Sequence, residues 1–429
     1  MIIKKIFPAL VFIIISLIFH NCDKKMKNLD ELYAERTINA NRQQFQEELI
    51  SKTIEQNLKL PLNKKTESQW QGAFWGMGLA EYRSETCDSA IEFAVDNFFD
   101  HSTEFKRSLL EVIYGLYPDS FSYEIEKLVR STNNPKIFAM GIEHLLRIHP
   151  GRNNLYHDLI NKQFTKNLSN PILFMLSKRL KGNKAKLPPL TDLFAKPFDN
   201  KLLIFSFHRK NRDFPGLTVI RKPNGKFLRN SDGSLFHIRH LARSNSALPG
   251  YLTNGNTPQG IYSLQGLDIS ENVFIGPTPT LQMRLPHETS QNSFLHNKDI
   301  KKEAWTLAPY KELLPESWRN YFPIYSAYYA GKAGRSAIIA HGSTINPDFY
   351  QAKPYYPLTP SLGCLTALEL WSGETGECIY SEQLALIEAY RKFDSEGYLI
   401  LLDLNNKKYP VTINDIIDKI ITAEEMTGD

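Results

Sequence analysis

The hydrophobic pattern of the chain changes character once, between residues 182 and 197. From 67 to 181, apolar side chains recur every three or four residues, as at Phe105, Leu109 and Ile113, which is the period of helices buried on one side. After 197, short apolar runs alternate with Gly, Asn and Asp turns, which is typical of strands. We therefore predict an all-α domain over 67–181, a linker at 182–197, a mainly β domain over 198–405 and a tail at 406–429.

The helical half is punctuated at similar intervals. Asn-Asn-Pro at 133–135, His-Pro-Gly at 149–151 and Ser-Asn-Pro at 169–171 each interrupt the helical period. Short helices broken in this way predict a solenoid or an irregular bundle. Residues 22–66 are polar, with a broken apolar stripe, and are predicted to form a partly helical tether.

The second half combines many short strands with a few helices. Strands in this pattern favour a β-sandwich or a barrel-like sheet. The Lys- and Glu-containing stretch 290–320 is predicted as a helical insertion, and 381–393 as a helix. The predicted strands are 202–207, 217–221, 257–264, 273–275, 281–285, a hairpin of 324–330 with 336–340, and 397–404.

The N-terminus has the pattern of an export signal. Lys4 and Lys5 precede an apolar run at 6–19, which is short for a membrane span, and Cys22 follows. This order resembles a bacterial lipoprotein signal, in which residues 1–21 are removed and Cys22 is lipidated; an uncleaved membrane anchor is the alternative. Both readings place the body of the protein in the cell envelope, as a membrane-anchored protein of the periplasm.

The charge of the chain is small. Removing 1–21 takes away two lysines and no acid, so the formal net charge of +5 falls to +3. No dense Lys/Arg block is present, which argues against a nucleic-acid partner.

One stretch near the C-terminus carries recognisable chemistry. A short apolar run ends at His341-Gly342-Ser343, and after a Pro- and Tyr-rich loop comes Ser361-Leu362-Gly363-Cys364. A cysteine nucleophile needs a neighbouring base. It also needs free backbone N–H groups to bind an oxyanion. His341 and the Gly-Cys turn offer both, so this stretch is the candidate active site.

These motifs, with Thr257-Pro258-Gln259-Gly260-Ile261-Tyr262 upstream, resemble the signature of the L,D-transpeptidase family, whose catalytic domain is of the YkuD type. The resemblance covers about 202–404 and implies a sandwich-like catalytic domain. It implies that Cys364 attacks a peptidoglycan stem peptide at the bond between an L and a D centre. A thioester forms, and an acceptor amine resolves it into a new crosslink. No metal or other cofactor is implied.

The resemblance also implies residue roles. His341 is the general base and the Gly342 carbonyl orients its ring. Gly363 serves the oxyanion turn and Ser361 holds the shape of that turn. Ser343 and Arg335 are candidate substrate contacts. The family usually carries Arg where this chain has Thr366, and Arg335 or Arg284 are the residues that would supply the missing charge.

Several alternatives stay open. Water in place of the acceptor amine would make the site an L,D-carboxypeptidase or another peptidoglycan hydrolase. A non-catalytic wall-binding scaffold, whose helical half recruits a protein partner, is a third possibility. Rival bases are His237, His240, His287 and His296; a metal site at His237 and His240 is disfavoured because no Cys or carboxylate stands at ligand spacing. Cys87 and Cys378 are expected to be free or buried thiols.

Overall fold

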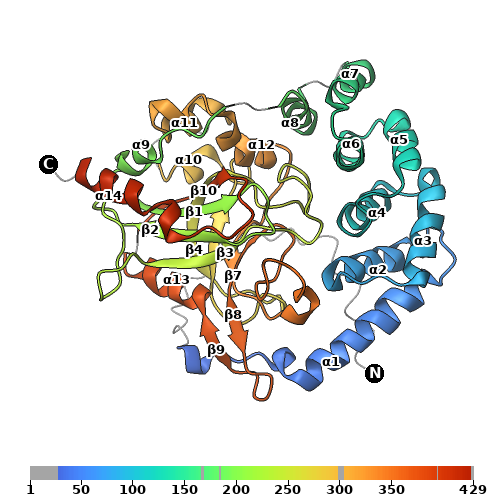
Figure 1. The fold of residues 1–429 in the computed structure, drawn as a ribbon, viewed down its shortest axis with the longest axis horizontal. Helices are drawn as coiled ribbons and strands as arrows, with labels where there is room; N and C mark the ends of the chain where they lie inside the picture. The colour runs from blue at the N-terminus through green and yellow to red at the C-terminus, as the bar shows by residue number, and fades with distance from the viewer. Residues whose placement is uncertain (1–27, 166–168, 183–184, 298–303, 394, 427–429) are drawn as a thin grey trace.

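The computed structural model describes residues 28–165, 169–182, 185–297, 304–393 and 395–426. It contains a curved array of helices from the first half of the chain and a β-barrel from the second (Figure 1). The chain is thus a mixed helical and β protein. The predicted signal at 1–21 and the predicted lipidated Cys22 lie outside the described residues. Among the described residues, no helix has the length and apolar character needed to cross a bilayer.

The β-sheet closes on itself in the order β1-β10-β4-β5-β6-β7-β3-β2. The sandwich that we expected is therefore wrong: one closed sheet takes the place of two stacked ones. β1 runs parallel to β10 and β6 parallel to β7, and the other neighbours are antiparallel. The barrel strands are β1 (Leu202–Arg209), β2 (Gly216–Arg221), β3 (His237–Leu241), β4 (Gly260–Asp268), β5 (Thr280–Arg284), β6 (Ala340–His341), β7 (Leu365–Ala367) and β10 (Gly397–Asn405).

Both faces of β1, a strand of the barrel wall, are buried. Alternate side chains such as Ile204, Ile238 and Leu399 fill the interior. The other face of β1, with Phe205, packs against helices outside the barrel. These helices include two from stretches that we predicted as linker and tail. The helices around the barrel are α9 (Leu190–Ala195), α10 (Gln291–Phe294), α11 (Leu307–Glu312), α12 (Ser326–Lys332), α13 (Glu382–Arg391) and α14 (Ile417–Met426).

The hairpin predicted for 324–340 is wrong. A 3₁₀ turn at Phe322–Tyr325 leads directly into α12, and only Ala340 and His341 of this stretch are in a strand. Tyr325 and Tyr328, three residues apart, are both buried in the hydrophobic core between the barrel and the helices packed outside it. Bulky aromatics raise β propensity in the sequence, but here their helical spacing decides the structure. The strand predicted at 273–275 is likewise a turn, closed by Ile275 N donating to Asn272 O at 2.9 Å.

The helices of the first half stack in two layers. α2, α4, α6 and α8 touch in succession, and α3, α5 and α7 pack against them on the outside (Figure 1). The array curves around one side of the barrel, and α8 contacts α12. The helices are α1 (Asn39–Glu48), α2 (Glu67–Ala80), α3 (Glu85–Asp96), α4 (Thr103–Leu116), α5 (Ser122–Ser131), α6 (Pro135–Ile148), α7 (Asn153–Gln163) and α8 (Pro171–Leu180).

Two of the three predicted helix breaks are also helix starts. Asn134 Oδ1 accepts hydrogen bonds from Lys136 N at 2.9 Å and from Ile137 N at 3.2 Å, and Pro135 occupies the first position of α6. Asn170 and Pro171 begin α8 in the same way. An Asn cap followed by Pro satisfies amides that have no partner within the helix.

The first described residues form an arm along the barrel domain. Cys378 N donates to Leu32 O at 3.0 Å and Ala34 N donates to Gly376 O at 2.9 Å. The arm thus adds to the ribbon of β8 (Glu369–Trp371) and β9 (Cys378–Ser381). It lies within the stretch that we predicted as a tether.

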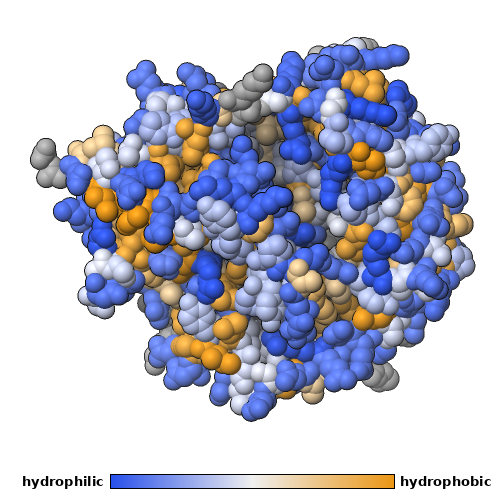
Figure 2. Space-filling model, in the orientation of Figure 1, coloured by the Kyte–Doolittle hydropathy of each residue, from blue (hydrophilic) through white to orange (hydrophobic). Residues whose placement is uncertain are grey.

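The surface seen in Figure 2 is mostly hydrophilic over both parts of the molecule. Hydrophobic residues appear as small separate clusters, the broadest of them on the barrel side at the left. Small scattered clusters of this kind are normal for a folded surface.

The capping asparagine supplies a stability test with a matched neighbour. We expect Asn134→Ala to lower the free energy of unfolding by about 1 kcal/mol, because two amides of α6 lose their acceptor. Asn133→Ala, at an exposed position next to the cap, serves as the control. Urea denaturation of both variants checks this, and equal losses would contradict the capping role.

Candidate active site

The parallel pairing of β6 with β7 brings the two motifs together. Ala340 lies opposite Leu365 and His341 opposite Thr366, and Leu365 N donates to Ile339 O at 3.0 Å. Cys364 immediately precedes β7, two residues before Thr366. Because side chains alternate along a strand, this register directs Cys364 to the same side of the sheet as His341. Two residues 23 positions apart in the sequence thus stand on adjacent strands.

The turn before Cys364 is held by its own serine. Ser361 Oγ accepts from Gly363 N at 3.0 Å and donates to Cys364 O at 3.1 Å. Gly363 has φ 115°, a conformation that L side chains rarely adopt. The amide of Gly363 is therefore committed to Ser361. Of the two amides that we assigned to an oxyanion, that of Cys364 has no acceptor among the described residues.

The upstream Thr-Pro-x-Gly motif supports the same turn. Thr257 Oγ1 lies 3.0 Å from Gly363 O and 3.2 Å from Cys364 O. Thr257 is 1 % exposed, so this hydroxyl is shielded from competing water. The motif residues on either side of the site are therefore joined by direct hydrogen bonds.

His341 is held as a neutral base. Its Nδ1 donates to the Gly342 carbonyl, which leaves the lone pair on Nε2. Burial lowers the pKa of His341 to about 4, and the hydrogen bond to Gly342 only partly opposes this effect. At neutral pH the ring is therefore unprotonated at Nε2. The carbonyl that we predicted to orient the ring is the one that contacts it.

The buried carboxyl group of Glu369 holds the His-Gly-Ser turn through a hydrogen bond. Glu369 Oε2 accepts from Ser343 N at 3.0 Å and Oε1 accepts from Ser381 Oγ at 2.7 Å. A Cβ on Gly342 would come within 2.0 Å of this carboxyl, so only glycine fits there. Burial raises the pKa of Glu369 to about 7.

Ser343 is occupied within the same turn. Its hydroxyl accepts from Thr359 Oγ1 at 2.6 Å and from Ile345 N at 3.2 Å. Ser343 also lines a cavity of about 80 Å³ together with Glu369 and Trp371. These bonds make it a turn former in the resting protein.

The Cys364 thiol rests between a cation and a carboxylate. Sγ donates to Ala337 O at 3.5 Å. Burial raises the pKa of the thiol, the nearby Glu288 raises it further, and a backbone hydrogen bond from Ile339 and the charge of Arg335 oppose the rise. The resting group is therefore a thiol. Ala337 has φ 57°, a strained conformation that Glu288 holds by accepting from Ala337 N at 2.8 Å.

Arg335 is the cation next to Cys364. It is 7 % exposed, and burial lowers its pKa to about 10. A Cβ on Gly363 would come within 2.2 Å of Arg335 Nη2. Arg284, the other candidate for this charge, instead faces Glu288, with Nε 3.8 Å from Oε1.

Thr366 supports the Pro- and Tyr-rich loop. It is 1 % exposed, and its Oγ1 donates to Thr359 O at 2.7 Å. This bond fastens the Pro- and Tyr-rich loop to β7. Arg335, on a different segment, is the cation that acts on the charge of Cys364. Leu362, at the tip of the turn, is 50 % exposed.

The rival histidines lie elsewhere. His237 is exposed on β3, His296 contacts Ser263 and Gly397, and His287 packs against Trp305 and Tyr328. His240 points into the barrel. His240 and His341 both lie on strands that pair with β7, but the ring of His240 is fully buried and hydrogen-bonded to Thr218 Oγ1.

Sequence reasoning missed a polar chain inside the barrel. His208 Nε2 contacts Ser206 Oγ, Ser206 contacts Thr218 Oγ1, and Thr218 contacts His240 Nδ1, each at 2.8 Å. Burial lowers the pKa of His208 well below its usual value and that of His240 to about 3, with His341 adding to the effect on His240. The signal was available, because Ser206 and His208 alternate within a buried strand.

Cys87 in α3 and Cys378 in β9 are buried free thiols. Across the part of the chain that the structure describes, no three His, Cys, Asp or Glu side chains are grouped as metal ligands.

No protein-family model, curated protein or solved structure matches this chain. The functional assignment therefore depends on its own residues and on their geometry.

The buried histidines predict acid sensitivity. The pKa values of His208, His240 and His341 are lower in the folded than in the unfolded chain, so below about pH 6.5 the unfolded chain binds more protons. We expect each to reduce stability as the pH falls from about 6.5 towards 4. Glu369 has a raised pKa in the folded chain, so it instead increases stability as the pH falls over this range.

One variant isolates this effect. His240→Asn retains a partner for Thr218 and removes the titrating ring, so the stability of the variant should depend on pH by about one proton less, or about 1.4 kcal/mol per pH unit. Urea unfolding at pH 6.5, 5.5 and 4.5 measures the slope. The exposed His237→Asn on the same strand is the control, and identical slopes in the two variants would contradict the prediction.

Proposed function

We propose that the protein is a cysteine-dependent L,D-transpeptidase that acts on peptidoglycan stem peptides in the cell envelope. The observation that carries this proposal is the pairing of β6 with β7, which sets a neutral His341 next to the Cys364 turn. The Thr-Pro-x-Gly, His-Gly-Ser and Ser-x-Gly-Cys segments, which resemble that family, meet at this one place. A buried structural cysteine would need none of these supports.

The proposed reaction follows from the resting state. His341 Nε2 takes the proton of the Cys364 thiol as sulfur attacks the carbonyl carbon of the scissile amide. The negative charge that develops on oxygen is bound by the free amide of Cys364 and by the field of Arg335. Collapse breaks the C–N bond, and the imidazolium gives its proton to the leaving amine. The thioester is then attacked by an acceptor amine, with His341 again taking a proton, and the thiol is released.

In the resting state Cys364 is a thiol and His341 is a neutral imidazole. These protonation states imply a particular pH dependence of the acylation rate. His341 loses its basic form only near pH 4, and the raised pKa of Cys364 keeps the thiol protonated in the neutral range. We expect the acylation rate constant to stay level between about pH 5 and 8. A steep loss of rate within that range would indicate a thiolate–imidazolium pair instead. Stopped-flow acylation across the range measures this.

The direct test is intact-mass analysis with a carbapenem and, separately, with tetrapeptide muropeptides. Members of the family that the chain resembles are acylated by carbapenems at this cysteine. We expect a covalent adduct and dimeric muropeptides with the wild type, and neither with Cys364→Ala. His341→Gln should lower the acylation rate by about 10²–10⁴-fold.

The products separate the alternatives. An adduct with only trimmed monomers would assign a hydrolase or carboxypeptidase to the same site. No adduct and no turnover, with Cys364 inert to alkylation, would overturn the enzymatic proposal and leave a wall-binding scaffold. Cys378→Ala, which removes a buried thiol away from the turn, is the matched control.

A further inference from the structure

The segment between β3 and β4, residues 242–257, packs against both parts of the molecule; we call it the bridging segment. Its middle belongs to the helical array, because Leu248, Tyr251 and Leu252 are buried in the same hydrophobic core as α2 to α8. Its ends belong to the barrel, since they continue β3 and lead into β4. A single stretch thus joins the helical half to the candidate active site.

Buried polar groups fix the middle of the bridging segment to the array. Tyr251 OH donates to Glu143 Oε1 at 2.7 Å, and Arg179 Nε donates to Glu143 Oε2 at 2.6 Å. Glu143 lies in α6 and is fully buried. Asn254 Nδ2 donates to the carboxylate of Glu111 in α4, at 3.1 Å to Oε2. A buried carboxylate is stable only while its donors stay in place, so Tyr251 has little freedom to move.

The ends of the bridging segment hold the catalytic turn. Ser244 forms a parallel bridge with Ser361, and Asn245 N donates to Ser361 O at 2.9 Å. Thr257, at the other end, contacts the carbonyls of Gly363 and Cys364.

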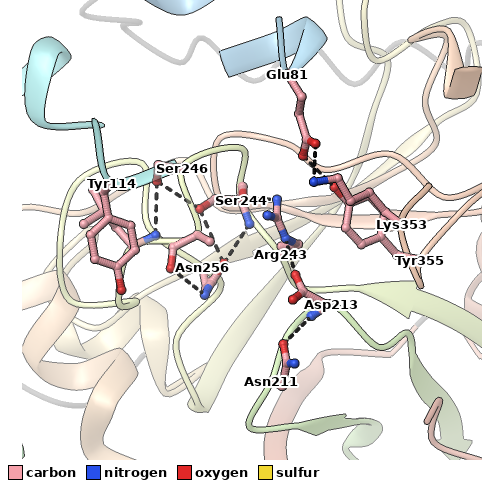
Figure 3. Close-up of polar contacts among 12 residues, drawn as sticks. Glu81, Tyr114, Asn211, Asp213, Arg243, Ser244, Ser246, Asn256, Lys353 and Tyr355 are labelled. Carbon is pink, nitrogen blue, oxygen red and sulfur yellow. Dashed lines mark hydrogen bonds and ion pairs between the residues drawn. The ribbon is translucent and has the colours of Figure 1, made fainter. Parts of the chain in front are cut away.

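The two ends of the segment are also tied to each other. Ser244 N donates to Asn256 Oδ1 at 2.8 Å, and Figure 3 shows the Asn256 side chain reaching across the segment to Ser244. On the other side of the neighbouring Arg243, Glu81 of the helical half contacts Lys353 and Tyr355 of the Pro- and Tyr-rich loop (Figure 3). Ser361 and Cys364 therefore contact the two ends of a closed, cross-braced loop.

Arg335 connects the middle of the segment to Cys364. Its guanidinium donates to the carbonyls of Gly250, Gly255 (2.9 Å) and Asn256 (2.8 Å). These carbonyls flank Tyr251. The same guanidinium touches Gly363 and lies close enough to Cys364 to act on its charge. A displacement of Tyr251 would therefore move the acceptors that hold Arg335 in place.

We infer that Tyr251 is a positioning residue for Cys364, through which Glu143 of the helical array sets the place of Arg335 beside the thiol. This inference deepens the proposed function, on which its catalytic meaning rests, by giving the helical half a part in the chemistry. It does not require Tyr251 to touch substrate. It requires only that the contacts from Glu143 to Cys364 act as one connected unit.

The experiment uses the full chain and Tyr251→Phe, which keeps the ring and removes the hydroxyl. The rate constant for alkylation of Cys364 by iodoacetamide is measured from pH 6 to 10 by peptide mass analysis, which distinguishes Cys364 from Cys87 and Cys378. We expect a fall of about threefold to tenfold at a fixed pH below the midpoint, and a midpoint moved to higher pH, because Arg335 stabilises the thiolate less well. Carbapenem acylation should slow in parallel.

Two controls separate positioning from general loss of stability. Ile160→Val removes a methylene from the core of α7, away from the bridging segment, and should leave the alkylation profile unchanged at a comparable loss of melting temperature. Tyr123→Phe tests the same chemical change at a 77 % exposed site. If Tyr251→Phe does not fold, Glu143→Gln is used, with the same direction of change expected, because its amide interacts less well with Arg179.

A double-mutant cycle with Arg335→Met tests whether the effect of Tyr251 on Cys364 passes through Arg335. If Arg335 carries the coupling, Tyr251→Phe should have little further effect in the Arg335→Met background. Full additivity would overturn this route, and a Tyr251→Phe profile equal to the wild type would overturn the inference as a whole. Alkylation needs no peptidoglycan chemistry, so a wild type that forms neither a carbapenem adduct nor any muropeptide product would refute the proposed function while this test still stands.

Discussion

The shortest strands of the barrel are the ones on which the site depends. β6 contributes two residues and β7 three, yet together they connect β5 to β3 and close the sheet. The same parallel pairing places His341 on the strand next to the Cys364 turn. Closure of the barrel and assembly of the candidate site are therefore one structural event. So short a pairing cannot be stable alone, which explains why so many side-chain bonds from Thr257, Thr366 and Glu369 surround it.

What the sequence could predict was local. The helix interruptions at Asn134 and Asn170, the strands β1, β2 and β10 and the residues of the candidate Cys364 turn were all predicted from short motifs with a direct physical meaning. Closure of the sheet was beyond reach, because it depends on β6, which is too short to give a periodic signal. The helix α12 was misjudged because its tyrosines favour strands by composition and helix only by spacing.

The polar interior of the barrel and the bridging segment show a second limit of prediction from the sequence. Ser206, Thr218 and His240 come from three strands, and only the barrel reveals that their side chains meet. Arg335 could be named from the sequence as a candidate charge, but its three backbone acceptors come from a segment about 80 residues earlier. Contacts between distant segments of irregular backbone leave no pattern in one sequence. The motif residues were predictable, and the structure that holds them was not.

The arm at residues 28–38 has a mechanical consequence. Its hydrogen bonds to Gly376 and Cys378 attach the start of the described chain to the β8–β9 ribbon, before any helix of the array begins. Tension applied through the N-terminus would be borne first by this ribbon, which continues directly from β7, and the helical array would be bypassed. The helical array would then stay free of that load.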